Sequence, residues 1–269
     1  MPIHYEERDG HVSLITIDRP ETRNALDMYH FRDLAQSWRR FKDDPEAWVA
    51  IVTGVEDAFM AGADLKTFIP QVTKLQKEIA AGDVKEVDGC RLSDSVYAVL
   101  RNVKIYKPII AAVNGFCVAG GMEMLGGVDI RIACPEATFA VMEPKRGLFA
   151  GGGTTVRLPR QIPFPAAMEF LLTAERFPAE RALELGLLNE IVPREELLDR
   201  ARAWARRITA NAPLAVQATK ESVLRCLALD MDEAYKLEAE ISSKVFQTED
   251  AKEGPKAFAE KRDPVWQGR

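Results

Sequence analysis

Two glutamates occupy positions where a short polar or glycine-rich break follows an apolar run. Glu123 ends the stretch N-G-F-C-V-A-G-G-M-E, and Glu143 ends the stretch F-A-V-M-E. Gly147 and three consecutive glycines at 151–153 follow the second glutamate. Proton transfer next to a carbonyl group requires positioned carboxylates and backbone N–H groups that stabilise an oxyanion. The two glutamates therefore predict acid–base chemistry of that kind.

Each glutamate also has a structural interpretation when it is taken alone. Glu123 could cap the first turn of a helix that begins near Gly120, and Glu143 could form an ion pair with Lys145 or Arg146. If both side chains instead face one pocket, burial and mutual repulsion separate their pKa values. One carboxyl group then serves as an acid and the other as a base.

A second glycine turn supplies a candidate backbone donor. The sequence A-G-A-D-L-K at 61–66 follows an apolar run at 48–53 that is typical of a strand buried on both faces. The turn at Ala63 could present an unpaired N–H group, as the first residues of the helix near Gly120 do. Two such donors form an oxyanion hole, in which losing one costs roughly 2.7–4 kcal/mol of barrier stabilisation. A plain turn in which Asp64 caps a following helix is the alternative.

Composition and charge exclude several other classes of protein. A net charge of −5 and the lack of any basic block argue against a nucleic-acid partner. No window approaches the roughly 18 apolar residues of a membrane helix, and residues 1–10 lack the apolar region of a signal peptide. The four cysteines lie far apart without a C-x-x-C pair, which predicts reduced, mostly buried thiols in a cytoplasmic protein without a metal site.

The histidines argue against a hydrolase. His4, His11 and His30 are the only three, and no G-x-S-x-G motif is present. A Ser-His-Asp or Cys-His hydrolase would need one of them beside a distant nucleophile. We therefore expect surface histidines.

The order of the elements predicts an α/β fold. Strands are expected at 11–18, 48–53, 109–113, 129–133 and 138–141, with a helix from Asp27 to about Lys42. The later pattern is helical, at 165–173, 178–185, 195–211, 213–228 and 231–246. We expect one structural unit in which a core over 1–195 precedes a helical region over 196–269 that packs on partner subunits.

Several motifs in this order resemble the crotonase superfamily, and within it enoyl-CoA hydratase. They are A-G-A-D-L-K at 61–66, A-V-N-G at 112–115, A-G-G-x-E at 119–123, and Glu143 followed by the glycine run at 151–153. The match covers nearly the whole chain, from R-P at 19–20 to A-F-A-E-K-R at 257–262. The resemblance implies a crotonase-type spiral of ββα units with a helical C-terminal trimerisation region, assembled as a homotrimer or a dimer of trimers.

The resemblance also implies the roles of the site residues. The N–H groups of Ala63 and Gly120 would polarise the thioester carbonyl of an acyl-CoA. Glu123 would help to activate a water molecule, and Glu143 would deliver a proton to the α-carbon.

Further positions are implied to contact the substrate. The backbone around Ala61, Asp64, Leu65 and Lys66 would lie along coenzyme A, and Gly151 would lie near the water. The tail residues Phe258 and Lys261 would reach coenzyme A bound to a neighbouring subunit. Coenzyme A would thus enter as part of the substrate, with no separate cofactor and no metal.

The chain departs from the pattern of family hydratases in three places. Those enzymes often carry proline before the second glutamate and ahead of the glycine run, where this chain has Met142 and Ala150. The segment 66–107 also looks longer than in a short-chain hydratase. Because the family places this segment along the acyl pocket, we expect a non-standard acyl group.

Hydration fits the pair of glutamates best among the crotonase reactions. Isomerases usually work with one catalytic carboxylate, whereas adding water needs one group for the nucleophile and another to protonate carbon. We therefore predict a hydro-lyase that converts a 2-enoyl-CoA into a 3-hydroxyacyl-CoA. The alternatives are a Δ3,Δ2-enoyl-CoA isomerase, a carnitine-type CoA hydratase or racemase, a decarboxylase, and a non-catalytic acyl-CoA-binding protein.

Overall fold

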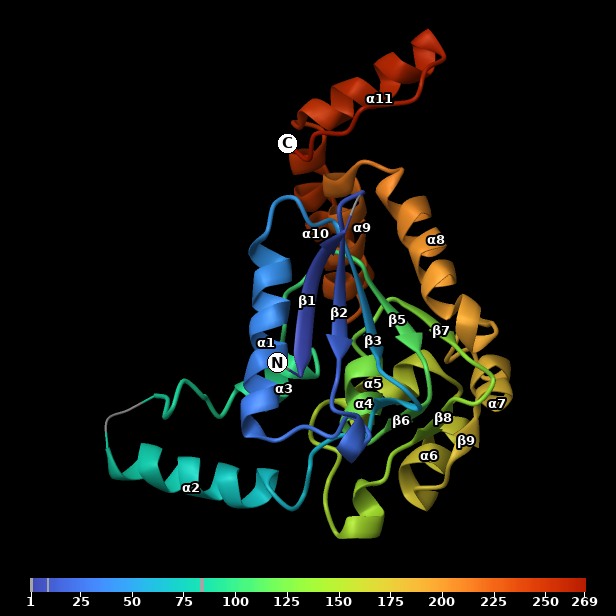
Figure 1. Cartoon of the computed structure of the whole chain (residues 1–269). Coiled ribbons are helices and arrows are strands. Elements are labelled where there is room, and N and C mark those ends of the chain that lie inside the picture. Colours follow the sequence, from blue (N-terminus) through green and yellow to red (C-terminus); the bar gives the residue numbers. More distant parts are fainter. Residues whose placement is uncertain (1, 9, 83–84) are drawn as a thin grey trace.

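The main sheet contains the strands that the apolar runs predict. The computed structural model describes residues 2–8, 10–82 and 85–269 (Figure 1). Its six-stranded sheet has the order β1-β2-β3-β5-β7-β10, with β1 and β2 antiparallel and the other pairs parallel. The strands are β1 (Ile3–Arg8), β2 (Val12–Ile17), β3 (Val49–Gly54), β5 (Ile109–Val113), β7 (Ile130–Ala133) and β10 (Glu190–Ile191).

A second sheet has the strand order β4-β6-β8-β9. The successive pairs β3–β4, β5–β6 and β7–β8 each place one strand in either sheet before the chain enters a helical segment. This repeated course is a ββα spiral, which confirms the predicted fold. The strands of the second sheet are β4 (Ala58–Met60), β6 (Phe116–Val118), β8 (Thr138–Ala140) and β9 (Phe177–Pro178).

The helices of the core alternate with these strands. Asp27 caps the first helix and accepts hydrogen bonds from the N–H groups of Tyr29 and His30, as predicted. The α-helices are α1 (Met28–Asp43), α2 (Phe68–Ala81), α3 (Asp94–Ala98), α4 (Gly120–Leu125), α5 (Thr154–Gln161), α6 (Phe164–Thr173) and α7 (Ala179–Glu184). Short 3-10 helices are η1 (Pro20–Thr22), η2 (Glu143–Arg146) and η3 (Arg194–Glu196).

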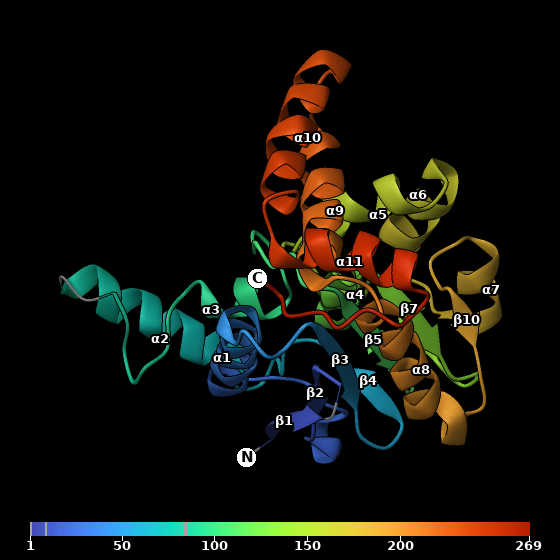
Figure 2. The same cartoon turned by 90° about the horizontal axis from the view of Figure 1, so that it is seen from above.

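The last helices continue beyond the spiral. They are α8 (Leu197–Thr209), α9 (Pro213–Cys226), α10 (Met231–Val245) and α11 (Glu249–Glu260). Helix α11 covers a stretch for which the sequence made no helix prediction, because Gly254 and Pro255 interrupt its pattern. Figure 2 shows α9 and α10 side by side, projecting away from the sheets.

Helix α8 belongs to the core by its packing. Val49 of β3 enters a hydrophobic cluster with Leu197 and Ala201 of α8, whereas Ala50 enters the cluster that contains Trp38 of α1. Because side chains alternate along a strand, β3 is covered on both faces, which explains its continuous apolar sequence. The helices that leave the core therefore begin with α9, although the sequence divided the chain at 195/196.

The histidines and cysteines lie outside the cavity described below. His4 contacts Asp18 at 3.1 Å, and His11 stacks on Trp48 with ring centroids 3.7 Å apart. All four cysteines are free, and three of them are buried, as predicted. No helix in the described ranges is long and apolar enough to cross a membrane.

Candidate active site

One cavity of about 560 Å³ brings together both glutamates and both predicted backbone donors. These four residues come from the chain that follows β4, from α4 and from η2. The strands β4, β6 and β8 are adjacent and parallel, so the segments that follow them emerge at the same edge of the second sheet. Ala63, Gly120, Glu123 and Glu143 all line this cavity.

The donor at Ala63 is oriented by a short pairing with the chain before α1. Leu26 donates its N–H to the carbonyl of Gly62 at 2.8 Å and accepts from the N–H of Asp64 at 2.9 Å. Successive N–H groups of an extended chain point in opposite directions. The N–H of Ala63 therefore points away from Leu26, and it has no hydrogen-bond partner in the described part of the chain.

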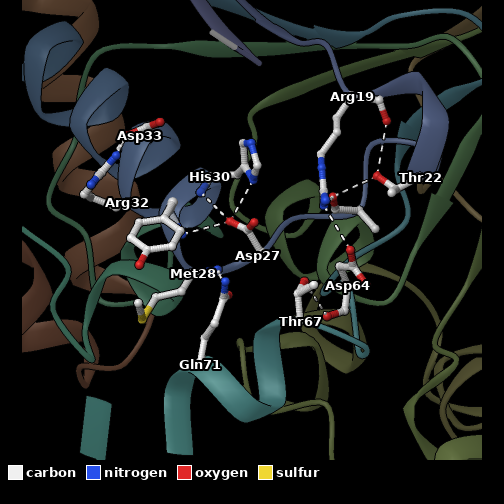
Figure 3. A network of polar contacts seen from close by, with 12 residues as sticks. Arg19, Thr22, Asp27, Met28, His30, Arg32, Asp33, Asp64, Thr67 and Gln71 are labelled. Carbon is white, nitrogen blue, oxygen red and sulfur yellow. Dashed lines mark hydrogen bonds and ion pairs between the residues drawn. The ribbon is translucent and has the colours of Figure 1, made fainter. Parts of the chain in front are cut away.

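The loop that carries Ala63 is fixed by polar contacts to the N-terminal segment (Figure 3). Arg19 forms an ion pair with Asp64 at 3.2 Å, and the N–H of Met28 donates to Oε1 of Gln71 at 3.1 Å. The prediction that Asp64 caps a helix is wrong. Helix α2 begins at Phe68 with Thr67 as its N-cap, and the Asp64 side chain accepts from the N–H of Lys66 at 3.2 Å, before the helix starts. Asp64 instead holds its own loop against Arg19.

The second donor lies at the first residue of α4, where the sequence predicts a helix start. Ala119 has a φ of 49°, a strained value for alanine, and it turns the chain directly before Gly120. A Cβ on Gly62 would lie 2.8 Å from the nitrogen of Gly120, so the two glycine turns touch. Both donors consequently face one cavity from neighbouring turns.

Glu123 is held on α4 with one carboxylate oxygen bonded to backbone. Oε1 accepts a hydrogen bond from the N–H of Gly152. Burial raises the pKa of Glu123, while this N–H and the charges of Arg101 and Arg157 act in the opposite direction. The pKa of Glu123 is raised overall, but these opposing contacts make Glu123 the member of the pair with nearby groups that favour ionisation.

Glu143 has a different environment at the start of η2. Its Oε2 is buried and has no hydrogen-bond partner among the described residues. Burial raises the pKa of Glu143 to about 7, and the charge of Glu123 adds to the shift. Neither Lys145 nor Arg146 forms an ion pair with Glu143 within the described ranges. The alternative in which Glu143 serves only as an ion-pair partner of these residues is therefore not supported. The two carboxyl groups thus have the separated pKa values that an acid and a base require.

The other predicted contact residues divide into three groups. Ala61, Leu65 and Gly151 line the cavity. Asp64 and Lys66 lie next to it without lining it. Phe258 and Lys261 lie at the end of α11, outside the cavity, and Phe258 is 87% exposed. Their role toward a neighbouring subunit stays a prediction.

The wall of the cavity, which is apolar apart from Ser95, was not predicted residue by residue from the sequence. Five of its residues come from the long segment 66–107, which was expected to border the acyl pocket and which lines the cavity that contains both glutamates. The wall also includes Met142, at a position where family hydratases often carry proline. Its members are Phe31, Phe68, Ile69, Ser95, Val96, Val99, Met142, Leu148 and Phe149. The adjacent apolar residues Phe68 and Ile69, near the start of a segment rich in charged residues, were the sequence signal that could have predicted this wall.

A ββα spiral with two backbone donors and two glutamates at one cavity defines a crotonase-type protein. The chain belongs to the enoyl-CoA hydratase/isomerase family, whose model matches residues 7–269. Among the described residues, no group of His, Cys, Asp and Glu side chains is placed to hold a metal ion.

Several relatives extend over the whole chain. Enoyl-CoA hydratase EchA19 of Mycobacterium tuberculosis is 42% identical over 98% of this chain and 96% of its own. (E)-benzylidenesuccinyl-CoA hydratase of Thauera aromatica is 38% identical over 100% of both chains, and carnitinyl-CoA dehydratase of Escherichia coli K12 is 37% identical over 97% of both. A crystal structure of enoyl-CoA hydratase from Mycobacterium tuberculosis H37Rv superimposes with a TM-score of 0.85, at 40% identity over 100% of this chain and 99% of that one.

Proposed function

We propose that this protein is a hydro-lyase, an enoyl-CoA hydratase that adds water across the double bond of a 2-enoyl-CoA to give a 3-hydroxyacyl-CoA. The observation that carries the proposal is the cavity shared by Ala63, Gly120, Glu123 and Glu143. The relatives that carry hydratase or dehydratase names support the same class of reaction.

The two backbone donors stabilise the charge that develops during the reaction. The thioester oxygen accepts hydrogen bonds from the N–H groups of Ala63 and Gly120. As water adds to the β-carbon, electrons of the double bond move toward the thioester and form an enolate. The donors bind that oxygen more strongly as it becomes negative, which lowers the barrier.

The two glutamates move the protons. Ionised Glu123 accepts a proton from the attacking water, and protonated Glu143 donates its proton to the α-carbon. Each turnover therefore ends with the proton on Glu123 and the charge on Glu143. One proton must return from Glu123 to Glu143, or exchange with solvent, before the next turnover.

Coenzyme A is proposed to bind as part of the substrate along Ala61, Asp64, Leu65 and Lys66. The assembly proposed is a homotrimer or a dimer of trimers, in which Phe258 and Lys261 reach coenzyme A on a neighbouring copy. Exposed apolar residues on α9, on α10 and in the connection between them, including Leu227 at 76% exposure, support packing against further copies. The four free cysteines support a reducing, cytoplasmic location, and the reaction would belong to fatty acid or other lipid metabolism.

The acyl group is proposed to be larger than a short straight chain. The phenylalanines and aliphatic residues of α2, α3 and the 148–149 turn enclose space beside the glutamates. An apolar wall of this kind favours a bulky apolar acyl group, because its burial is favourable in proportion to its area.

A purified protein assayed with a panel of 2-enoyl-CoA esters tests the proposal. Hydration is followed by the loss of the conjugated thioester absorbance, with crotonyl-CoA, longer straight chains and aromatic acyl groups. We expect turnover, with a higher kcat/KM for bulky acyl groups. Tight binding of the esters without turnover would favour the non-catalytic alternative, and double-bond migration without hydration would favour the isomerase.

A further inference from the structure

Arg157 on α5 contacts three backbone carbonyls around the catalytic helix. Its Nη1 donates to the carbonyl of Val99 at 3.3 Å and to that of Glu123 at 3.2 Å. Its Nη2 donates to the carbonyl of Leu100. The guanidinium therefore connects α5, the end of α3 and the backbone of Glu123 itself.

Arg101 contacts the glycine run that binds the Glu123 carboxylate. Its guanidinium donates to the carbonyl of Gly151. The next residue, Gly152, donates its N–H to Oε1 of Glu123. Because the Gly151 carbonyl and the Gly152 N–H belong to one planar peptide group, Arg101 helps to orient that donor toward the carboxylate.

The charges around the two glutamates are unequal. Arg157 from α5 and Arg101 from the chain after α3 both favour ionised Glu123, and Glu143 from η2 is the negative charge nearby. Burial lowers the pKa of Arg157, and the charge of Glu123 opposes that shift. Arg146 and Arg176 also line the cavity, but the guanidinium of Arg146 donates to the carbonyl of Lys145 at 3.4 Å, and that of Arg176 lies over the ring of Phe116, 5.2 Å from its centroid. Both cations that act on the pair therefore lie on the side of Glu123.

We propose that Arg157 and Arg101 are positioning residues that keep the single proton of the carboxylate pair on Glu143 and hold Glu123 ionised against Gly152. The proposal rests on the hydration reaction proposed above. After each turnover the proton is on Glu123, where it blocks the next attack by water. Two guanidiniums beside Glu123 disfavour that state and drive the proton back, with no change in the total number of protons.

Paired substitutions separate charge from packing. Arg157→Gln and Arg101→Gln remove the charge, while Arg157→Lys and Arg101→Lys retain it without the planar fork. Arg160→Gln is the matched control, because Arg160 is exposed on the same helix and bonds to the carbonyl of Val156. Each variant is assayed for kcat/KM against pH, and circular dichroism reports folding.

The acid limb of the pH profile is the decisive measurement. We expect it to move upward by about 1 unit in Arg157→Gln, and by less in Arg101→Gln because that charge is exposed and screened. The lysine variants and Arg160→Gln should keep the limb of the wild type. An unmoved limb in both glutamine variants, or equal shifts in the lysine and glutamine variants, would overturn the proposal. If Arg157→Gln does not fold, the comparison of Arg101→Gln with Arg101→Lys decides whether the proposal stands.

A second readout does not depend on turnover. Carbon-13 NMR of glutamate-labelled protein without substrate follows the carboxyl groups of Glu123 and Glu143 directly, with Glu123→Gln and Glu143→Gln for assignment. The glutamine variants of the arginines should raise the titration midpoint of Glu123. If that shift occurs while the wild type hydrates no enoyl-CoA, the proposed function fails and the arginine role stands. If the wild type hydrates an enoyl-CoA and the titration midpoint of Glu123 does not shift, the proposed function stands and the arginine role fails.

Discussion

Gly152 donates its backbone N–H to Oε1 of Glu123, and a Cβ at Gly152 would overlap the same carboxylate. The position therefore requires both the N–H group and the absence of a side chain. This contact joins the glycine run before α5 to the catalytic helix α4, and it leaves the Glu123 side chain lining the cavity.

Gly152→Ala is expected to displace the Glu123 carboxylate and to lower kcat by about 100-fold, because a misplacement near 1 Å has that effect on a positioned group. Gly151→Ala is the matched comparison. A Cβ there would meet its nearest neighbour, the carbonyl of Phe149, at 3.8 Å, so the loss should be far smaller. Steady-state kinetics of both variants check this, and equal losses would contradict it.

Replacing either catalytic carboxyl group by an amide should remove its proton transfer while keeping its shape. Glu123→Gln and Glu143→Gln are each expected to lower kcat by roughly 10²–10⁴-fold, with little change in the affinity for the CoA ester. Glu169→Gln, on an exposed position of α6, is the control. Turnover near that of the wild type in either variant would overturn the assigned roles.

The pH dependence follows from the two carboxyl environments. Burial, together with the charge of Glu123, raises the pKa of Glu143 to about 7. Hydration needs Glu143 protonated, so kcat/KM should fall as the pH rises through about 7. It should also fall at low pH, where Glu123 takes up a proton. A profile of kcat/KM from about pH 5 to about pH 9 tests this. Because the two carboxyl groups interact, the acid and alkaline limbs of the profile report the titration of the pair and not of one glutamate each. A flat profile across neutrality is incompatible with the assignment.

The close approach of the two glycine turns can be tested at Gly62. Gly62 has a φ of +87°, and a Cβ there would lie 2.8 Å from the nitrogen of Gly120. Gly62→Ala should separate the two donors, with a loss equivalent to one oxyanion contact, roughly 2.7–4 kcal/mol of the barrier. Gly186→Ala carries the same kind of backbone strain at a φ of +75° with open space around the Cβ. Similar kcat losses in both would show that strain alone is responsible.

The apolar surface of α9 and α10 predicts the assembly. Leu224 and Leu227 are 53% and 76% exposed, and Met231 is 63% exposed. Light scattering after size exclusion should give a trimer or a hexamer, and Leu227→Glu should shift the mass toward the monomer, because a buried unpaired charge opposes association. A wild type that is monomeric at assay concentration would contradict the predicted assembly.

The local pattern of the sequence was enough to locate most elements of the core. The helix after Asp27, the buried strands near residues 50 and 110 and the helix start at Gly120 were predicted correctly. These elements depend on capping, periodicity and continuous apolar runs, which are properties of neighbouring residues. Helix α11 was not predicted because Pro255, a residue that usually ends a helix, interrupts the helical periodicity of its sequence.

The sequence by itself pointed to the four residues of the candidate site, since each stands at a polar or glycine-rich break after an apolar run. Only the tertiary structure decided how they act. Asp64 pairs with Arg19, 45 positions away, rather than capping a helix. The arginines beside Glu123 and the burial of Glu143 also arise from segments far apart in the chain. Burial and electrostatic interaction are sums over such contacts, so no local pattern encodes which glutamate holds the proton.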